Sequence, residues 1–306
     1  MDVVAEHDRV LAGLDPLLPE TGPLPVEPPA RLLSVTAGPS AGQALARYGE
    51  VGAEDPLAMW GALRRHMLTV RLAGPDRAGV LRELLHEWLG ALDVRVGDWD
   101  TSASVTVPSR DPVVRLPLVE LGFAPLIVVA ARRAGTSTPA GSDVPVREAV
   151  VADLDQLADL NDALVDTDAH NGVVTSRPGQ RERLREGLET TLAGAPGWTL
   201  VAGEPRAVGF VQVNRPEQAA WIVPMSSAGA EAAYLSGMYV EPKERGSGVG
   251  AALVGKAHAR IDAAGVPLTL LHYAVPNPRS GPFWSRMGYR PLWTTWQRRP
   301  AARPEL

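Results

Sequence analysis

The spacing of apolar residues in the C-terminal half alternates between helical and strand periods. Leucines recur at helical spacing after Asp153, a second helix is expected over 181–192, and a third begins at Val249 and ends at Gly265. Short apolar runs bounded by turn residues predict strands between these helices. The expected strands cover residues 144–147, 198–202, 207–213, 231–240 and 266–272. This order predicts an α/β domain.

The N-terminal half has a different pattern of apolar residues and prolines. A short helix is possible over 3–14, and six prolines between Pro16 and Pro29 then favour an extended arm. A strand over 66–72 and a helix over 80–89 follow. The segment 134–143 is rich in Gly, Ser, Thr and Pro, which is the composition of a linker. We therefore expect an extension at 1–30, a first domain at 31–133, a linker at 134–143 and a second domain at 144–306.

The two halves share a faint repeat. After Gly122 and after Gly288 a proline lies three residues on, and a pair of arginines lies ten and eleven residues on. The repeat indicates two related domains in tandem, the first of them truncated. An unrelated α/β domain with a chance match remains the alternative for the N-terminal half.

The most distinctive motif is a glycine-rich loop between the strand 231–240 and the helix that follows. The chain reads Arg245-Gly-Ser-Gly-Val-Gly250 there. Glycines let backbone N–H groups close around an anion, and a helix N-terminus adds unpaired N–H groups and a positive dipole end. The loop therefore predicts a diphosphate cradle. It lacks the Gly-Lys-Ser/Thr of a P-loop and the Gly-x-Gly-x-x-Gly of a dinucleotide fold. A tightly packed strand–turn–helix corner is the structural alternative.

The spacing Arg245-x-x-Gly248-x-Gly250 resembles the acetyl-CoA loop of the GCN5-related N-acetyltransferase (GNAT) family. A second likeness follows, with Asn277 after a strand and then Phe-Trp-x-x-x-Gly-Tyr ending at Tyr289. The resemblance covers roughly residues 144–299. It implies a mixed α+β sheet with the acyl-CoA N-acyltransferase fold in the C-terminal half. It also implies a degenerate GNAT-like domain at 31–133, because no such loop follows Leu72.

The resemblance implies acetyl-CoA as co-substrate and transfer of acetyl to a primary amine of a small molecule or an amino terminus. Trp284 stands where the family often has a tyrosine that acts as acid, so the acid is open among Tyr239, Tyr273, Tyr289 and solvent. An acyl-CoA-binding pseudo-acetyltransferase with a regulatory or structural role is the alternative function. The expected cofactor-binding residues are Met238, Tyr239, Val240, Arg245, Gly246, Ser247, Gly248, Val249, Gly250, Asn277 and Trp284.

The general base is not fixed by the sequence. Glu231, His272 and Tyr289 are weak catalytic candidates; His272 ends a strand near where family ligands converge, and imidazole titrates near neutrality. His258 lies off the apolar ridge of its helix, so we expect it to be exposed. Three further residues, Asp166, Asp168 and His170, are expected in a loop after the first helix, where they either attract a cationic amine or are simply solvated.

The amino-acid composition excludes several kinds of catalysis, metal site and partner. The 306 residues include no cysteine, so thiolate catalysis, disulfides and cysteine-based zinc sites are excluded. Net charge is −5 with only two lysines, which argues against a nucleic-acid partner. No apolar run has the length of a membrane span, and the acidic N-terminus does not read as a signal peptide. We expect a cytoplasmic monomer or homodimer without a metal.

Overall fold

The computed structural model describes residues 2–194, 197–227 and 231–303. The chain folds into two compact units. The first comprises Met1–Val128 together with Pro291–Leu306, and the second comprises Val129–Arg290. The boundary falls within strand β5 (Ala124–Arg133), and the segment 134–143 belongs to the second unit without helix or strand. No helix in the described residues is long and apolar enough to cross a membrane.

The first unit is built on five strands in the order β1-β2-β3-β4-β11, with β3 and β4 parallel and the other pairs antiparallel. The expected helix 3–14 is confirmed, as are the strand at 66–72 and the helix at 80–89 within slightly longer elements. The elements are α1 (Val3–Leu14), β1 (Arg31–Ala37), β2 (Ser40–Glu50), β3 (Arg64–Ala73), α2 (Arg77–Gly90), β4 (Thr101–Pro108), α3 (Arg115–Glu120) and β11 (Arg290–Arg298).

The core of this unit lies between α2 and the sheet. Leu81, Leu84 and Leu85 are fully buried there, and each is worth about 1.5–3 kcal/mol relative to an exposed side chain. A Cβ placed on Gly42 would lie 2.5 Å from Val80 Cγ1, so glycine is what allows α2 to approach β2.

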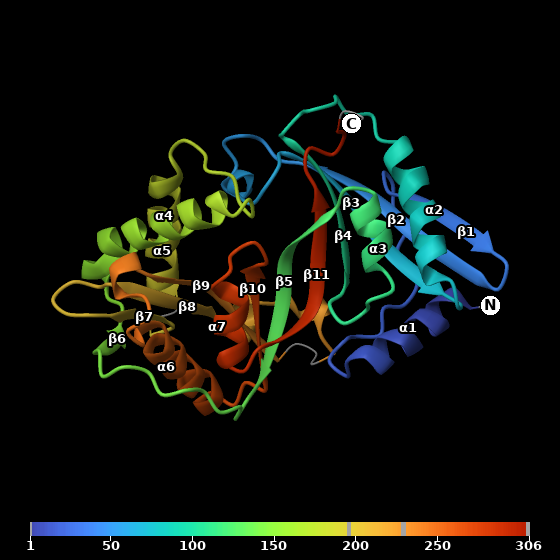
Figure 1. Cartoon of the computed structure of the whole chain (residues 1–306). Helices are drawn as coiled ribbons and strands as arrows, with labels where there is room; N and C mark the ends of the chain where they lie inside the picture. The colour runs from blue at the N-terminus through green and yellow to red at the C-terminus, as the bar shows by residue number, and fades with distance from the viewer. Residues whose placement is uncertain (1, 195–196, 228–230, 304–306) are drawn as a thin grey trace. The chain divides into compact units, whose positions relative to one another are not determined.

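The second unit has the strand order β10-β9-β8-β7-β6, with β9 and β10 parallel and the other pairs antiparallel. The predicted mixed α/β class is confirmed. The elements, labelled in Figure 1, are β6 (Val146–Glu148), α4 (Leu154–His170), α5 (Gln180–Gly194), β7 (Thr199–Ala202), β8 (Gly209–Asn214), β9 (Ala232–Val240), α6 (Val249–Ala263), β10 (Leu268–Ala274) and α7 (Ser280–Arg286).

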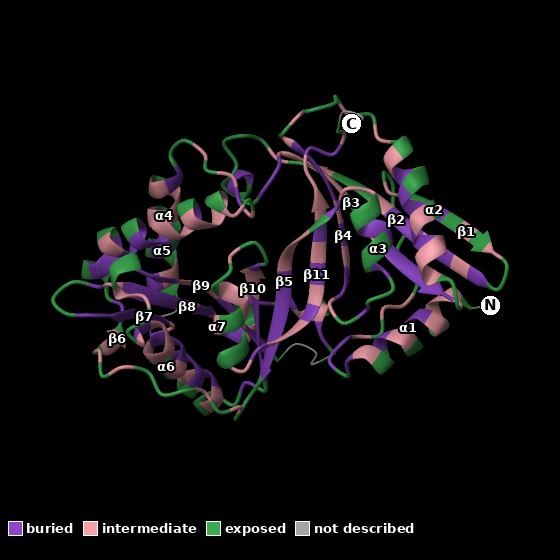
Figure 2. Ribbon diagram, in the orientation of Figure 1, coloured by how far each residue is buried: buried purple, intermediate pink, exposed green. Residues whose placement is uncertain are grey.

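Helices cover both faces of the second sheet. Tyr239 of β9 packs in a cluster with Leu157 of α4, whereas a Cβ on Gly209 of β8 would lie 3.3 Å from Leu253 of α6. Because successive strand residues face opposite sides, α4 and α6 lie on opposite faces of β8 and β9 (Figure 1). The central strands are accordingly buried along most of their length (Figure 2). This explains their nearly continuous apolar sequence.

Two sequence-based expectations are wrong. Asp166, Asp168 and His170 do not follow the first helix but form its last two turns, because α4 continues to His170. His258 is not exposed but buried, with 2% of its surface accessible. It lies on the side of α6 that meets Tyr289, and its Nε2 is 3.0 Å from the Tyr289 hydroxyl.

Candidate functional site

The parallel strands β9 and β10 separate at a bulge. Their register runs from Ala232 opposite Leu268 to Leu235 opposite Leu271 and stops there. The register between β8 and β9 shifts at the same level, which leaves Ser236 as the extra residue. A bulge bends its strand and ends regular pairing. Beyond Leu235, β9 therefore stays paired with β8, whereas its other edge is no longer paired with β10.

The alternation of backbone hydrogen bonds along β9 shows which of its groups face this open edge. The N–H of Glu241 donates to the carbonyl of Val208 at 2.9 Å, so Glu241 directs its N–H toward β8. In antiparallel pairing, alternate residues bond to the partner strand and those between point away. Met238 and Val240 therefore direct their N–H and C=O groups toward the open edge, where the Val240 carbonyl oxygen already accepts from Arg245 Nε. Such groups can hold an extended amide-containing ligand and a carbonyl oxygen.

The glycine loop forms the end of the same edge. Gly246 and Gly248 have φ values of +87° and +90°, which side chains other than glycine rarely adopt. Gly248 is the N-cap of α6, and no described side chain caps this helix. The first N–H groups of an α-helix have no intrahelical partner, so in α6 they have neither such a partner nor a side-chain cap. The loop and helix start together form a backbone cradle for an anion.

The side chains of the loop are used to hold it in place. Arg245 Nε donates to the carbonyl oxygen of Val240 at 2.9 Å, and its guanidinium lies 5.2 Å from the centre of the Tyr239 ring. The Ser247 hydroxyl donates to the carbonyl oxygen of Glu244 at 2.6 Å. What the loop offers to a ligand is therefore mainly its backbone N–H groups.

The corresponding helix start in the first unit is already capped. Asp76 is the N-cap of α2, and its carboxylate accepts a hydrogen bond from the N–H of Gly79 at 2.8 Å. A carboxylate there occupies the position at which a phosphate would interact with the helix N-terminus. The helix start of the first unit thus has a side-chain cap, whereas α6 has none among the described residues; there the N–H of Ser142 donates to the carbonyl oxygen of Gly248 at 3.4 Å.

The strand edge in the first unit is also filled. The register between β3 and β4 ends at Leu68 and Val105, and beyond it the N–H of Leu72 donates to Nδ1 of His7 at 3.3 Å. Burial lowers the pKa of His7 to about 4, so the imidazole is neutral and can accept this bond at neutral pH. Helix α1 therefore supplies an acceptor to a backbone N–H of β3. In the second unit, by contrast, β9 is not paired with β10 beyond Leu235.

An aromatic group lies where β9 and β10 part. The Tyr234 hydroxyl is 3.0 Å from Nδ1 of His272, and the exposed Trp221 ring stacks on the imidazole with 5.9 Å between centroids. Burial lowers the pKa of His272 to about 4 and raises the pKa of Tyr234 above its usual value. Both groups are therefore neutral at pH 7. If the tyrosine accepts from Nδ1–H, the Nε2 lone pair remains available as a proton acceptor.

The other two catalytic candidates lie in different surroundings. Glu231 is exposed and immediately precedes β9. Tyr289 is buried and paired with His258; burial raises the pKa of Tyr289 and lowers the pKa of His258 to about 3. The Tyr289 hydroxyl is thus engaged inside the unit, and only His272 lies at the separation of the two strands.

Asn277 and Trp284 belong to the turn and helix after β10. Asn277 Oδ1 accepts a hydrogen bond from the N–H of Arg279 at 3.0 Å and so shapes the turn into α7. Trp284 is 7% exposed, and its ring meets Tyr289 edge-on at 5.3 Å between centroids. The neighbouring Phe283 lies 3.4 Å from where a Cβ on Gly250 would be, so α7 contacts the first turn of α6.

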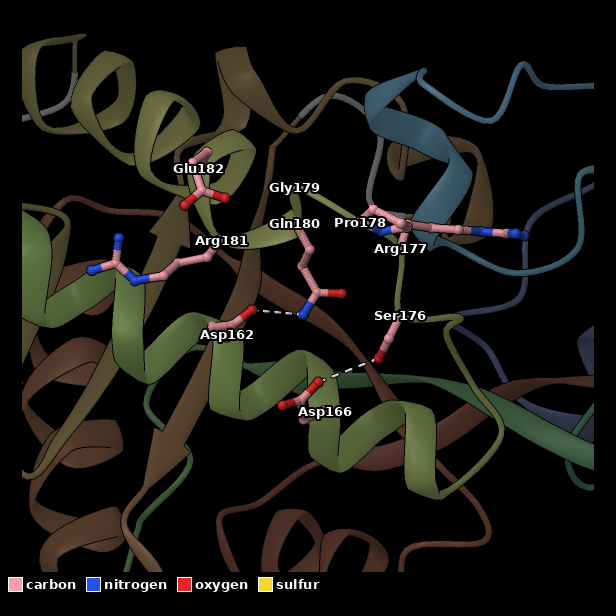
Figure 3. A pocket seen from close by; sticks show the side chains of 9 residues that line it. All are labelled: Asp162, Asp166, Ser176, Arg177, Pro178, Gly179, Gln180, Arg181 and Glu182. Atoms are coloured by element: carbon pink, nitrogen blue, oxygen red, sulfur yellow. Dashed lines mark hydrogen bonds between the residues drawn. The ribbon is translucent and has the colours of Figure 1, made fainter.

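Sequence reasoning missed Trp221 as a member of this group, since no motif marks it. It also missed a hollow of about 430 Å³ between α4 and the start of α5, shown in Figure 3. Aspartates at helical spacing along α4 are the sequence signal that could have found the hollow.

No group of three or more His, Cys, Asp or Glu side chains in the described part of the chain could hold a metal ion.

Comparison with known proteins agrees with this geometry. Residues 166–289 match the family model described as Acetyltransferase (GNAT) family. A GCN5-related N-acetyltransferase from Sphaerobacter thermophilus superposes with a TM-score of 0.56 at 14% identity, covering 87% of this chain and 82% of that one. A GNAT-family acetyltransferase from Colwellia psychrerythraea gives 0.50 at 12% identity, covering 76% of each chain. No curated protein sequence matches the chain.

At this identity the structural matches show a shared fold, and they extend over most of the chain. The family model matches residues 166–289, which lie within the second unit and are less than half of the chain. Members of that family are acyltransferases, and acetyl-CoA is their general co-substrate.

Proposed function

We propose that the chain is an N-acetyltransferase that moves acetyl from acetyl-CoA to a primary amine of a small molecule or an amino terminus. The observation that carries the proposal is the continuous backbone edge of the second unit. It runs from the separation of β9 and β10, past Met238 and Val240, to the uncapped start of α6. From the start of α6 back toward the separation of the strands, a diphosphate, an amide-containing arm and a carbonyl oxygen find suitable donors in that order.

In this proposal the N–H groups of the loop at 246–250 bind the diphosphate. The N–H of Met238 or Val240 stabilises the charge that develops on the acetyl oxygen. His272 takes the proton that the amine loses, and Tyr234 orients its ring. Holding the two reactants together supplies much of the rate enhancement in such a transfer.

The leaving thiolate needs no protein acid in this proposal. Trp284 has no acidic hydroxyl, and the Tyr289 hydroxyl is buried against His258. A thiol has an ordinary pKa near 8.5, so its thiolate is a tolerable leaving group that water can protonate.

Acetyl transfer is tested directly by following thiol release from acetyl-CoA with a panel of primary amines and peptides. Release that depends on the amine, with an acetylated product found by mass spectrometry, supports the proposal. Tight acetyl-CoA binding without transfer to any amine in the panel supports the pseudo-acetyltransferase instead.

We predict one acetyl-CoA per chain. The first unit has Asp76 at its helix start and His7 at its strand edge, whereas no described side chain caps α6 and β9 is not paired with β10 beyond Leu235. Calorimetric titration of the full chain should give a stoichiometry of one. Two equivalent sites would contradict the argument that these side chains replace a ligand.

We predict that Asn277→Ala raises the KM for acetyl-CoA several-fold. Alanine removes both the amide donors and the acceptor that shapes the turn. Asn277→Asp is the matched control, because it keeps the acceptor for Arg279 N–H while it replaces the amide donors by a negatively charged oxygen. Steady-state kinetics separate the roles: a defect in both variants indicates ligand contact, and a defect in alanine alone indicates turn geometry. Unchanged KM and kcat in both would remove Asn277 from the site.

We predict that Trp284→Phe keeps most activity and that Trp284→Ala loses it. The indole packs edge-on against Tyr289 and Phe283, so an aromatic replacement preserves the wall between α7 and α6. Truncation of a buried aromatic costs about 3–5 kcal/mol and misplaces the reactants. Kinetics and thermal unfolding of both variants check this. A phenylalanine variant as inactive as the alanine variant would show that the indole N–H makes an essential contact.

A further inference from the structure

Asp168 is a half-buried carboxylate near the end of α4. Among the described residues no hydrogen bond and no ion pair reaches it, and burial alone raises its pKa to about 6. Most of the carboxylate is therefore ionised at pH 7. Its oxygen atoms are not sealed inside the protein, since neither of them belongs to the fully buried polar atoms that have no partner. A ligand can consequently reach this charge.

The carboxylate belongs to the face of α4 that covers the sheet. Leu157, Asn161 and Leu164 precede Asp168 on this face, and the four positions follow at intervals of four, three and four residues. The first two side chains are buried, and Leu164 packs against the same core. The last position of this covered face is thus a charged one. Asp166, two residues earlier, lies on the other side of the helix and is exposed.

Contacts along α4 show which part of β9 this carboxylate lies over. Gln156 Oε1 accepts from the N–H of Ala207 at 3.0 Å, just before β8, whose first residue pairs with the last residue of β9. Two turns later, Leu164 Cδ2 lies 3.7 Å from where a Cβ on Gly237 would be. The helix therefore runs antiparallel to β9. One further turn advances about 6 Å, or about two strand residues, and brings Asp168 to the level of the bulge in β9.

The bulge directs the proposed base toward the same side of the sheet. Phe210 and Asn214 lie four residues apart on β8, so both face the side that α4 covers. Tyr234 pairs with Asn214 and therefore faces this side too. Without the bulge it would face α6, because successive strand residues alternate. Since the Tyr234 hydroxyl bonds to His272, the imidazole shares this face with Asp168.

The surroundings favour an organic cation as the partner of the carboxylate. A half-buried charge without a counter-charge is destabilising, and a bound cation removes that effect. The exposed Trp221 ring meets Tyr234 edge-on at 4.8 Å between centroids and offers an apolar surface beside His272. An ammonium on a carbon chain uses both features. A metal ion would need several protein ligands, and no such group occurs in the residues that the structure describes.

We propose that the acceptor is a diamine or polyamine and that Asp168 binds its second, non-reacting ammonium group. This inference rests on the proposed acetyl transfer and names the substrate class for it. Asp168 forms charge-assisted hydrogen bonds with one ammonium, the carbon chain lies against the Trp221 ring, and the other nitrogen reaches His272 as the free amine. Anchoring the acceptor at its far end holds the reacting nitrogen near the strand edge.

Binding is measured first, without turnover. The full chain is saturated with free coenzyme A, which carries no acetyl group, and is titrated calorimetrically with 1,3-diaminopropane, 1,4-diaminobutane and 1,5-diaminopentane. The monoamine of equal chain length is the reference for each diamine. At least one diamine should bind at least tenfold more tightly than its monoamine, because hydrogen bonds to a charged group account for a factor of this size. The absence of a preference in all three pairs would overturn the inference.

Two variants with the same change of charge locate the preference. Asp168→Asn should bring the affinity for the diamine to within about twofold of that for its monoamine. Asp166→Asn is the matched control on the exposed side of α4 and should keep the preference. Asp168→Asn should also unfold at or above the temperature of the parent, because it removes a half-buried charge without a partner. A lower unfolding temperature would show that the carboxylate is paired and would contradict the inference.

Turnover separates this inference from the proposed function. With acetyl-CoA, kcat/KM for the preferred diamine should exceed that for its monoamine at least tenfold, and Asp168→Asn should abolish this ratio. Transfer to both kinds of amine at equal rates would reject the role of Asp168 and leave acetyl transfer supported. Selective diamine binding without transfer would support the role of Asp168 and contradict acetyl transfer. Equal losses for both amines in Asp168→Asn would place the carboxylate at the reacting nitrogen and also overturn the inference.

Discussion

Gly248→Glu is expected to weaken acetyl-CoA binding by about two orders of magnitude or more. The substitution places a carboxylate at the uncapped start of α6, where the proposal places the diphosphate. Hydrogen bonds to a charged group contribute roughly 1.5–3 kcal/mol each, so losing two of them accounts for a change of this size. Calorimetric titration with acetyl-CoA measures it.

The control must separate charge from strain. Gly248 has a φ of +90°, and a Cβ there would lie 2.9 Å from the N atom of Ser142, so any side chain disturbs this turn. Gly248→Ala carries that strain without the charge and should bind acetyl-CoA much more tightly than the glutamate variant. Thermal unfolding of both variants verifies that they are folded. Equal affinity of the alanine and glutamate variants would mean that no phosphate lies at this helix start.

The regular elements could be predicted from the sequence because their periodicities are local. The helix over 3–14 and the strand before the glycine loop were expected within a residue of α1 and β9. The end of α4 was misjudged because polar residues such as Asp166 and Asp168 break the apolar pattern while the helix continues. Its polar face pairs with α5, a tertiary partner that periodicity does not reveal.

Burial of polar side chains was harder to predict for the same reason. His258 departs from the apolar ridge of α6 yet is buried, because Tyr289 supplies a hydrogen-bond partner 31 residues away. His7 is buried against Leu72 by a bond that spans 65 residues. The burial of a polar residue can be predicted only when its hydrogen-bond partner is known, and the fold determines which residue that partner is.

The glycine loop could be recognised from its sequence, because glycine positions and a helix start directly encode a backbone shape. The directions of the loop's side chains could not be predicted from the sequence. The Arg245 guanidinium lies against the Tyr239 ring and the Val240 carbonyl group, which depends on how the turn folds back. The bulge at Ser236 was likewise invisible, since it reflects pairing with β8 and not a residue preference.

The final expectation concerns the proposed base. His272→Phe should lower kcat by about two orders of magnitude or more, the usual range for loss of a general base, and leave acetyl-CoA affinity within twofold. Phenylalanine keeps an aromatic ring stacked on Trp221 and removes both nitrogens. Tyr234→Phe should cost less, because it removes only the hydroxyl that orients the imidazole. The matched control is His170→Ala, an exposed histidine at the end of α4, which should leave kcat unchanged.

The dependence of the rate on pH gives an independent check. Burial lowers the pKa of His272 to about 4, so its neutral, proton-accepting form persists from pH 8 down to about pH 5 and is lost as pH falls further. Protonation of the acceptor amine affects the parent and the His272→Phe variant alike, so the ratio of their rates isolates this group. The ratio should stay level between pH 8 and about pH 5 and decline toward pH 4. A decline centred near the ordinary histidine pKa of about 6.5 would show that the imidazole is solvated and not held in the buried group with Tyr234. A level ratio close to one at every pH would remove His272 from the proton transfer.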